Sequence, residues 1–285
     1  MKSLDSYKKE KEFLVCVDSD GCVIDSMNWK HKECFGVEFI SVFGFEKVRD
    51  EFLKIWNDIN LFSATRGINR FKGLVLALEI AREQKVYFED FQNLKNWAEH
   101  TSELSNDSLL KEMESKEIAV HDSDDLKKAY EWSIAVNNAI ASDKRETVIF
   151  GGSRDAIKEI SKFADIAVVS SANEEAVLAE WHESGLDKYV NIFLTQKYGS
   201  KSDCIKMLLE YGYENKNVLM VGDAPGDYQA ALSNNVWFYP ILVEHEKESW
   251  KNIISECFSL VMSEKFSNDM QDSFVEKFNK NLNIN

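Results

Sequence analysis

Apolar and polar positions alternate differently in three stretches of the chain. Residues 13 to 17 read FLVCV, an apolar run that ends at a group of acids and a glycine, as a buried strand does. From about residue 26 to residue 146, apolar residues recur at helical spacing and no proline interrupts them. From about residue 147, short apolar runs alternate with helix-sized amphipathic segments, which is typical of parallel strands covered by helices.

The later apolar runs complete the sheet that residues 13 to 17 begin. They are IAVVSS (166 to 171), YVNIFLT (189 to 195), NVLMVGD (217 to 223) and VWFYPI (236 to 241), and a polar helix is predicted from the neighbourhood of Asp269 onward. The sequence therefore predicts an α/β protein whose Rossmann-like, three-layer α/β/α core is interrupted by an all-helical domain. We expect residues 1–25 and 147–285 to form the core, and residues 26–146 to form the inserted domain.

Within the inserted domain, the spacing of apolar residues defines three helix faces. They are Phe52, Leu53 and Trp56; Leu74, Ala77, Leu78 and Ala81; and Leu126, Ala129 and Tyr130. Four tryptophans, Trp29, Trp56, Trp97 and Trp132, are expected in the core of this domain rather than on a ring-binding surface, because aromatic side chains dominate burial. The segment HDSDD at residues 121 to 125 is typical of a helix start rather than of a metal site.

Composition narrows the class of protein. With 285 residues, 44% of them apolar, the chain can bury a large core in two domains. Thirty-four basic residues against 49 acidic ones give a net charge of −15, which disfavours nucleic acid and anionic membranes as partners. No apolar run approaches the roughly 20 residues of a membrane helix, and the start MKSLDSYKKEKEF lacks a signal-peptide core. We therefore expect a cytoplasmic protein; the sequence does not define its oligomeric state.

The cysteines and histidines give no sign of a disulfide framework or a zinc site. The five cysteines, an odd number without a CxxC pair, are Cys16, Cys22, Cys34, Cys204 and Cys257. The five histidines lack a metal-ligand spacing such as HxxxH. Reduced thiols are expected.

Polar residues that could take part in catalysis or binding follow several of the predicted strands. Asp18, Asp20, Gly21 and Asp25 follow the first strand; Ser170 and Ser171 follow AVV; Lys201 precedes SDCIKMLLE; and Gly222, Asp223 and Asp227 follow VLMV. Because parallel strands aim their carboxyl ends at one edge of a sheet, these residues are expected to gather there. The alternative is that the acids only end strands and begin helices, with Pro225 at an early helical position.

The order of these motifs is similar to that of a known family. DxDGxxxD, a strand ending in serine, a lone lysine and GDxxxD resemble the haloacid dehalogenase superfamily in its phosphatase branch, and the likeness covers the whole chain in outline. The resemblance implies that the insertion is a helical cap of the C1 type, which closes over the site and selects the substrate. Asp25 is expected to have a structural role in its loop.

The resemblance also implies roles for the acids. Asp18 is the expected nucleophile, which forms an aspartyl phosphate, and Asp20 the general acid and then base. Asp18, the backbone carbonyl of Asp20 and the carboxylate of Asp223 are the expected ligands of Mg²⁺, whose preferred ligands are oxygens. The cation offsets a repulsion of about 4 kcal/mol between two like charges 4 Å apart near a protein surface.

For the remaining motif residues, the resemblance implies contacts to phosphate. Ser170 is expected to donate its hydroxyl to a phosphate oxygen, although Ser171 could take this role. Lys201 is expected to neutralise phosphate and acids together. Lys197 is the alternative, but Lys201 directly precedes a helix with Ser202 as a possible cap. This chain has KSDC where many relatives have KPxP. Asp227, with Gly222 of the same motif, is expected to support the metal or to pair with the lysine.

Residues 63 to 71, SATRGINRF, stand between two helical stretches of the insertion. Arg66 and Arg70 could supply the positive charge that an anionic substrate needs, since arginine suits bidentate contacts to phosphate or carboxylate. The alternative is a turn between helices with solvated arginines.

Together these features predict a Mg²⁺-dependent phosphomonoester hydrolase acting on a small phosphorylated metabolite. Asp20 disfavours the dehalogenating and phosphonate-cleaving branches, whose members lack that acid. A phosphomutase with the same core, and a binding or regulatory protein with a vestigial site, are the alternatives.

Overall fold

The computed structural model describes residues 4–114 and 124–284, and the chain divides into two compact units. Met1–Met27 and Glu146–Asn285 form one, which we call the core unit; Asn28–Arg145 form the other, which we call the helical unit.

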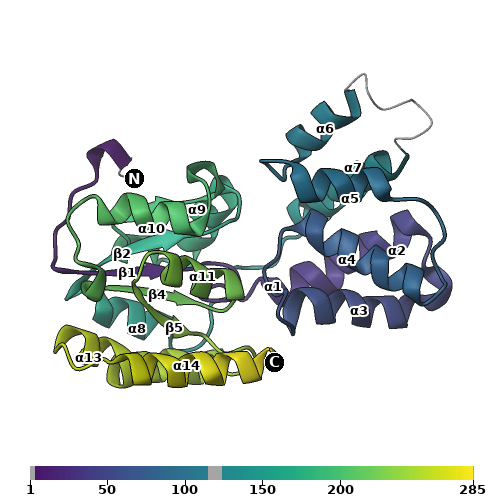
Figure 1. Ribbon diagram of the computed structural model, residues 1–285. Coiled ribbons are helices and arrows are strands. Elements are labelled where there is room, and N and C mark those ends of the chain that lie inside the picture. Colours follow the sequence, from purple (N-terminus) through teal and green to yellow (C-terminus); the bar gives the residue numbers. More distant parts are fainter. Residues whose placement is uncertain (1–3, 115–123, 285) are drawn as a thin grey trace. The chain divides into compact units, whose positions relative to one another are not determined.

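The core unit is built on one parallel sheet. Its strands are β1 (Phe13–Val17), β2 (Ala164–Val169), β3 (Ile192–Leu194), β4 (Val218–Gly222) and β5 (Trp237–Pro240), in the order β3-β2-β1-β4-β5. Figure 1 shows the purple β1 among strands coloured for much later parts of the sequence. Val17 pairs with Val168 on one side and with Val221 on the other. The predicted α/β fold and its five strands are confirmed.

Helices cover both faces of this sheet. They are α8 (Ser153–Ile160), α9 (Glu174–Glu183), α10 (Lys201–Leu209), α11 (Pro225–Ser233), α12 (Glu246–Ile253), α13 (Ser259–Met262) and α14 (Asn268–Asn281). Val15 and Val17 share a hydrophobic cluster with Trp181 of α9 and Trp250 of α12. Strand alternation turns Cys16 to the other face, toward Cys204 of α10. The yellow α14, the C-terminal helix predicted from the sequence, packs along β5 (Figure 1).

The helical unit has its own hydrophobic core. Its helices are α2 (Gly36–Phe43), α3 (Arg49–Leu61), α4 (Arg70–Glu83), α5 (Gln92–His100), α6 (Asn106–Glu114) and α7 (Asp124–Ser142), and the short α1 (Met27–Trp29) leads into it. The three predicted helix faces lie on α3, α4 and α7 and contribute to this core, although Leu53 and Tyr130 are only partly buried.

The tryptophans of the helical unit do not all belong to its core. Three of the four tryptophans are buried, but the expectation for Trp29 was wrong: its ring is half-buried, with the Arg145 guanidinium carbon 4.2 Å from the ring centroid. Residues 121 to 123 lie outside the described residues, whereas Asp124 and Asp125 form the first turn of α7.

The five cysteines are all buried free thiols. Among the described residues, no helix combines the length and apolar character needed to cross a membrane.

Candidate active site

The chain turns tightly after β1. The backbone N–H of Asp18 donates to the carbonyl of Val221 (3.0 Å), which continues the pairing of β1 with β4. The carbonyl of Ser19 then accepts hydrogen bonds from the N–H groups of residues 22, 23 and 24 (3.3, 3.0 and 3.0 Å). Gly21 adopts φ +82°, which favours glycine. This turn places Asp18 and Asp20 at the carboxyl edge of the sheet.

A second turn, after β4, depends on Gly222. Asp227 Oδ2 accepts hydrogen bonds from the N–H groups of Asp223 (3.1 Å) and Ala224 (3.0 Å), so its side chain folds back over the strand end. A Cβ atom at position 222 would lie 2.3 Å from Asp227 Cγ, so only glycine fits there. Pro225 begins α11, as predicted. The predicted strand-to-helix turn is present, and it also buries Asp223 and Asp227.

Lys201 joins the two turns. Its Nζ lies 3.0 Å from Asp18 Oδ2 and 2.5 Å from Asp227 Oδ1. It is the first residue of α10, but the expected cap at Ser202 was wrong: Ser200 caps the helix by accepting a hydrogen bond from the Asp203 N–H (3.2 Å). Lys197 is half-exposed and pairs instead with Glu174.

Burial, together with the neighbouring charges, controls the electrostatics of this cluster. Burial raises the pKa of Asp18 well above its ordinary value; Lys201 opposes this rise, while Asp227 and Asp223 add to it. Burial lowers the pKa of Lys201, but the nearby carboxylates of Asp18, Asp227 and Asp223 outweigh that effect and raise it. The lysine is therefore held as an ammonium ion.

The same carboxylates meet the requirements of a divalent cation. Asp18, Asp223 and Asp227 each offer an oxygen, and these oxygens lie within 4.8 Å of one another. Because Asp227 Oδ1 and Oδ2 already accept hydrogen bonds from Lys201 and the backbone, Asp18 and Asp223 are better placed as direct ligands. Hard oxygen donors of this kind suit Mg²⁺.

Asp20 is oriented by a side chain close to it in the sequence. The hydroxyl of Ser26 donates a hydrogen bond to Asp20 Oδ1, and Ser26 is buried. Sequence reasoning missed Ser26, although its position one residue after Asp25, at the end of the DxDGxxxD motif, was a usable signal.

Ser170 and Ser171 differ sharply in exposure. Ser170 follows β2 and is buried, and its Oγ accepts a hydrogen bond from the Ala172 N–H (3.2 Å). A hydroxyl that accepts one hydrogen bond can still donate its proton. Ser171 is exposed.

Arg66 and Arg70 belong to the helical unit, where neither is simply solvated. Arg66 is buried and its Nη1 donates to the carbonyl of Leu61 (2.8 Å). Arg70 Nη1 donates to Asn137 Oδ1 (2.7 Å) and to Ser133 Oγ (3.2 Å), and burial lowers the pKa of Arg70 to about 10. The alternative of solvated arginines was therefore wrong.

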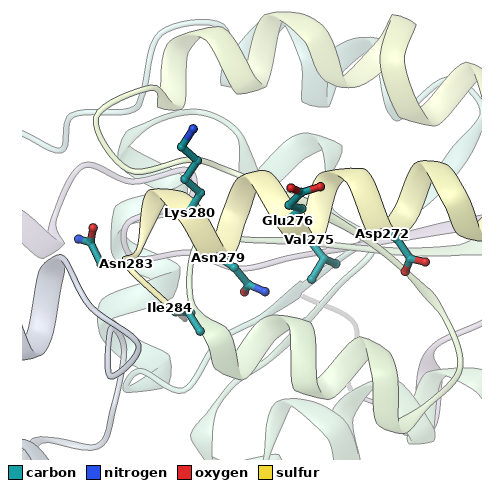
Figure 2. Close-up of a pocket in the computed structure, with 7 residues that line it drawn as sticks. All are labelled: Asp272, Val275, Glu276, Asn279, Lys280, Asn283 and Ile284. Atoms are coloured by element: carbon teal, nitrogen blue, oxygen red, sulfur yellow. The ribbon is translucent and has the colours of Figure 1, made fainter.

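A hollow of about 680 Å³ lies elsewhere on the core unit, along α14. Figure 2 shows that its labelled side chains point to two sides of this one helix, with Glu276 and Lys280 on one side and Val275 and Asn279 on the other. All its lining residues come from α14 and the residues that follow it. Because ligand pockets are usually enclosed by several elements, we do not regard it as the site.

Comparison with known proteins decides the family. The model of the haloacid dehalogenase-like hydrolase family matches residues 80–241, which is more than half of the chain. The chain belongs to this family. The match includes Ser170, Lys201 and Asp223 and begins after Asp18.

Solved structures include chains of similar fold. A haloacid dehalogenase-like family hydrolase from Xanthomonas campestris is 11% identical, with a TM-score of 0.50, over 90% of this hydrolase and 97% of that chain. A predicted phosphoglycolate phosphatase from Haemophilus somnus is 14% identical, with a TM-score of 0.49, over 86% and 98% of the two chains. No curated protein sequence matches this hydrolase.

Proposed function

We propose that this hydrolase is a Mg²⁺-dependent phosphatase that acts on a small phosphorylated metabolite through an aspartyl phosphate on Asp18. The observation that carries the proposal is the position of Lys201 Nζ, between Asp18 Oδ2 (3.0 Å) and Asp227 Oδ1 (2.5 Å). A fixed ammonium ion beside a buried carboxylate is suited to a reaction that brings a phosphate to that carboxylate.

In this proposal, Asp18 attacks phosphorus while the bond to the leaving oxygen breaks. Asp20 protonates that oxygen, and then removes a proton from the water that cleaves the acyl phosphate, which releases phosphate and regenerates Asp18. The hydrogen bond from Ser26 orients the Asp20 carboxyl group. Ser170 donates its hydroxyl to a phosphate oxygen.

The charge of the site supports the proposal of a metal. Three buried carboxylates face one ammonium ion, so an incoming phosphate meets net repulsion. Asp18, the carbonyl of Asp20 and Asp223 would hold Mg²⁺, which supplies charge neutralisation for the phosphate. Asp227 keeps Lys201 and the β4 turn in place.

The helical unit would act as the cap that selects the substrate. Arg70 is the better candidate of the two arginines for substrate contact, because Arg66 is only 4% exposed whereas Arg70 is partly exposed. An arginine preorganised by Asn137 and Ser133 can recognise carboxylate or phosphate with little loss of side-chain entropy.

The test is a panel of phosphate esters assayed with Mg²⁺ and with a chelator. We expect hydrolysis only with Mg²⁺, and loss of activity in Asp223→Asn but not in the matched control Asp25→Asn. Mg²⁺ should also raise the unfolding temperature of the unmodified protein and not that of Asp223→Asn, because only a folded site binds the ion. Hydrolysis that survives chelation would overturn the metal assignment, and transfer of phosphate to a second hydroxyl would indicate a mutase.

Arg70→Met should raise KM or change the preferred ester more than it lowers kcat. Arg82→Met is the control, because Arg82 lies on the same helix and donates to the carbonyl of Glu89 at the surface. Equal effects of the two variants would remove Arg70 from substrate recognition.

A further inference from the structure

Two buried tryptophans hold the turn that carries Asp18 and Asp20. Trp181 Nε1 donates a hydrogen bond to Ser19 Oγ (2.9 Å), and Trp250 Nε1 donates to the carbonyl of Cys22 (2.8 Å). Both indole side chains are fully buried. The two hydrogen bonds are made to residues on either side of Asp20 and Gly21.

These tryptophans act from the face of the sheet opposite Lys201. They lie on α9 and α12 and share a hydrophobic cluster with Val17 and Val221, the residues that lead into the two acidic turns. Lys201 and Asp227 reach Asp18 from α10 and α11. The acidic turn is therefore held from both sides, electrostatically on one and by indole N–H groups on the other.

The hydrogen bond to Ser19 is shielded from solvent. Ser19 is completely buried, although it stands between two acids at the candidate active site. Like charges at Asp18, Asp223 and Asp227 push against one another across the two turns, so the turn that carries Asp18 needs attachments that do not depend on those charges. A displacement of a reacting group by about 1 Å can lower a rate by about a hundredfold.

We infer that Trp181 and Ser19 form a positioning pair that fixes the turn bearing the nucleophile and the general acid, with Trp250 as a second anchor. The inference rests on the proposed function for its kinetic consequences. Its structural consequence, a turn immobilised by indole N–H donors, is measurable without turnover.

The test compares Trp181→Phe, Ser19→Ala and their double variant with Trp237→Phe. Trp237 Nε1 also donates to a backbone carbonyl, that of Lys216, but this side chain is only partly buried. For each single variant of the pair we expect kcat to fall by about 10- to 100-fold, with KM within about twofold. The double variant should be no slower than the slower single variant, because both remove one bond. Trp237→Phe should keep its kcat.

Hydrogen exchange separates this inference from the proposed function. Amide exchange in the peptide covering residues 14 to 26 should become at least about tenfold faster in Trp181→Phe and Ser19→Ala, with no change in β5. If the unmodified protein hydrolyses no phosphate ester, the proposed function fails and the exchange result alone decides the pair. Unchanged amide exchange in both variants, or additive losses of kcat in the double variant, would overturn the positioning role of Trp181 and Ser19. Ser19→Ala, which removes one oxygen atom, serves if Trp181→Phe does not fold.

Discussion

The amino and carboxyl edges of the central sheet each contain a buried aspartate, and the surroundings of these two aspartates differ. Asp165, near the amino end of β2, is completely buried, and its Oδ2 accepts hydrogen bonds from the N–H groups of Glu10 (2.8 Å) and Lys11 (3.0 Å) and from the hydroxyl of Tyr213 (2.5 Å). Its Oδ1 lies 3.5 Å from Lys11 Nζ. Asp18, at the carboxyl end of β1, faces one ammonium ion and two further carboxylates.

The difference shows that burial of an acid does not by itself mark a functional site. At the amino edge, donors compensate the buried charge and fasten the N-terminal segment to the sheet, so the arrangement serves stability. At the carboxyl edge, carboxylates are left facing one another, which costs stability and is expected where a cation and an anionic substrate bind.

The largest contrast should come from replacing each aspartate by asparagine. Asp18→Asn should lower kcat by at least about 10⁴-fold, because it removes the nucleophile, while the free energy of unfolding stays the same or rises by about 1 kcal/mol as repulsion is relieved. Asp165→Asn should lower the free energy of unfolding by about 2 to 4 kcal/mol, because the amide group places N–H donors against existing donors.

Urea unfolding and steady-state kinetics at 25 °C measure both effects. The folded Asp165→Asn protein should keep its kcat within about twofold, since this aspartate lies at the other edge of the sheet. A loss of activity in Asp165→Asn that exceeds its unfolded fraction would contradict a purely stabilising role for Asp165. Strong destabilisation by Asp18→Asn would contradict the expectation that the carboxylates near Asp18 cost stability.

A smaller effect is expected from the lysine that separates the carboxylates. Lys201→Met should lower kcat by about 10²- to 10³-fold, because the ammonium ion that neutralises phosphate and acids is lost. Lys197→Met is the matched control, four residues earlier, where the lysine pairs with Glu174 at the surface. Similar kinetic losses in both variants would show that Lys201 does not have the specific role proposed for it.

The sequence was sufficient for the sheet because its signals are local. Five apolar runs of strand length mark β1 to β5, and the parallel arrangement brings Asp18, Lys201 and Asp223 to one edge without any knowledge of side-chain contacts. Gly222 shows why the GDxxxD spacing matters, because the Asp227 side chain occupies the space of a Cβ atom at 222.

What the sequence could not provide were contacts between residues far apart in the chain. Trp181 and Ser19 are separated by 162 residues, and Asp165 and Tyr213 by 48. Neither spacing in the sequence predicts that the two residues are in contact. Ser200 was overlooked as a cap in favour of Ser202 because two serines flank Lys201, and only backbone geometry tells them apart.

The smallest predicted effect concerns the donors of the amino edge. Tyr213→Phe removes one of three hydrogen bonds to Asp165 Oδ2 and should lower the free energy of unfolding by about 1 to 3 kcal/mol without changing kcat. Burial raises the pKa of Tyr213, and the bonds with Asp165 and Tyr7 raise it further. The folded protein therefore keeps this proton when the unfolded chain loses it near pH 10, so stability falls as the pH rises above about 10.

Removing Tyr213 should make that alkaline decline shallower, by up to about 1.4 kcal/mol per pH unit, because one fewer group titrates differently in the two states. Urea unfolding between about pH 8 and pH 11 measures this slope. Tyr198→Phe, outside the Asp165 network, is the control. If both variants decline as steeply as the unmodified protein, the Tyr213 hydroxyl does not hold its proton against Asp165, and the amino edge is less completely compensated than its hydrogen bonds indicate.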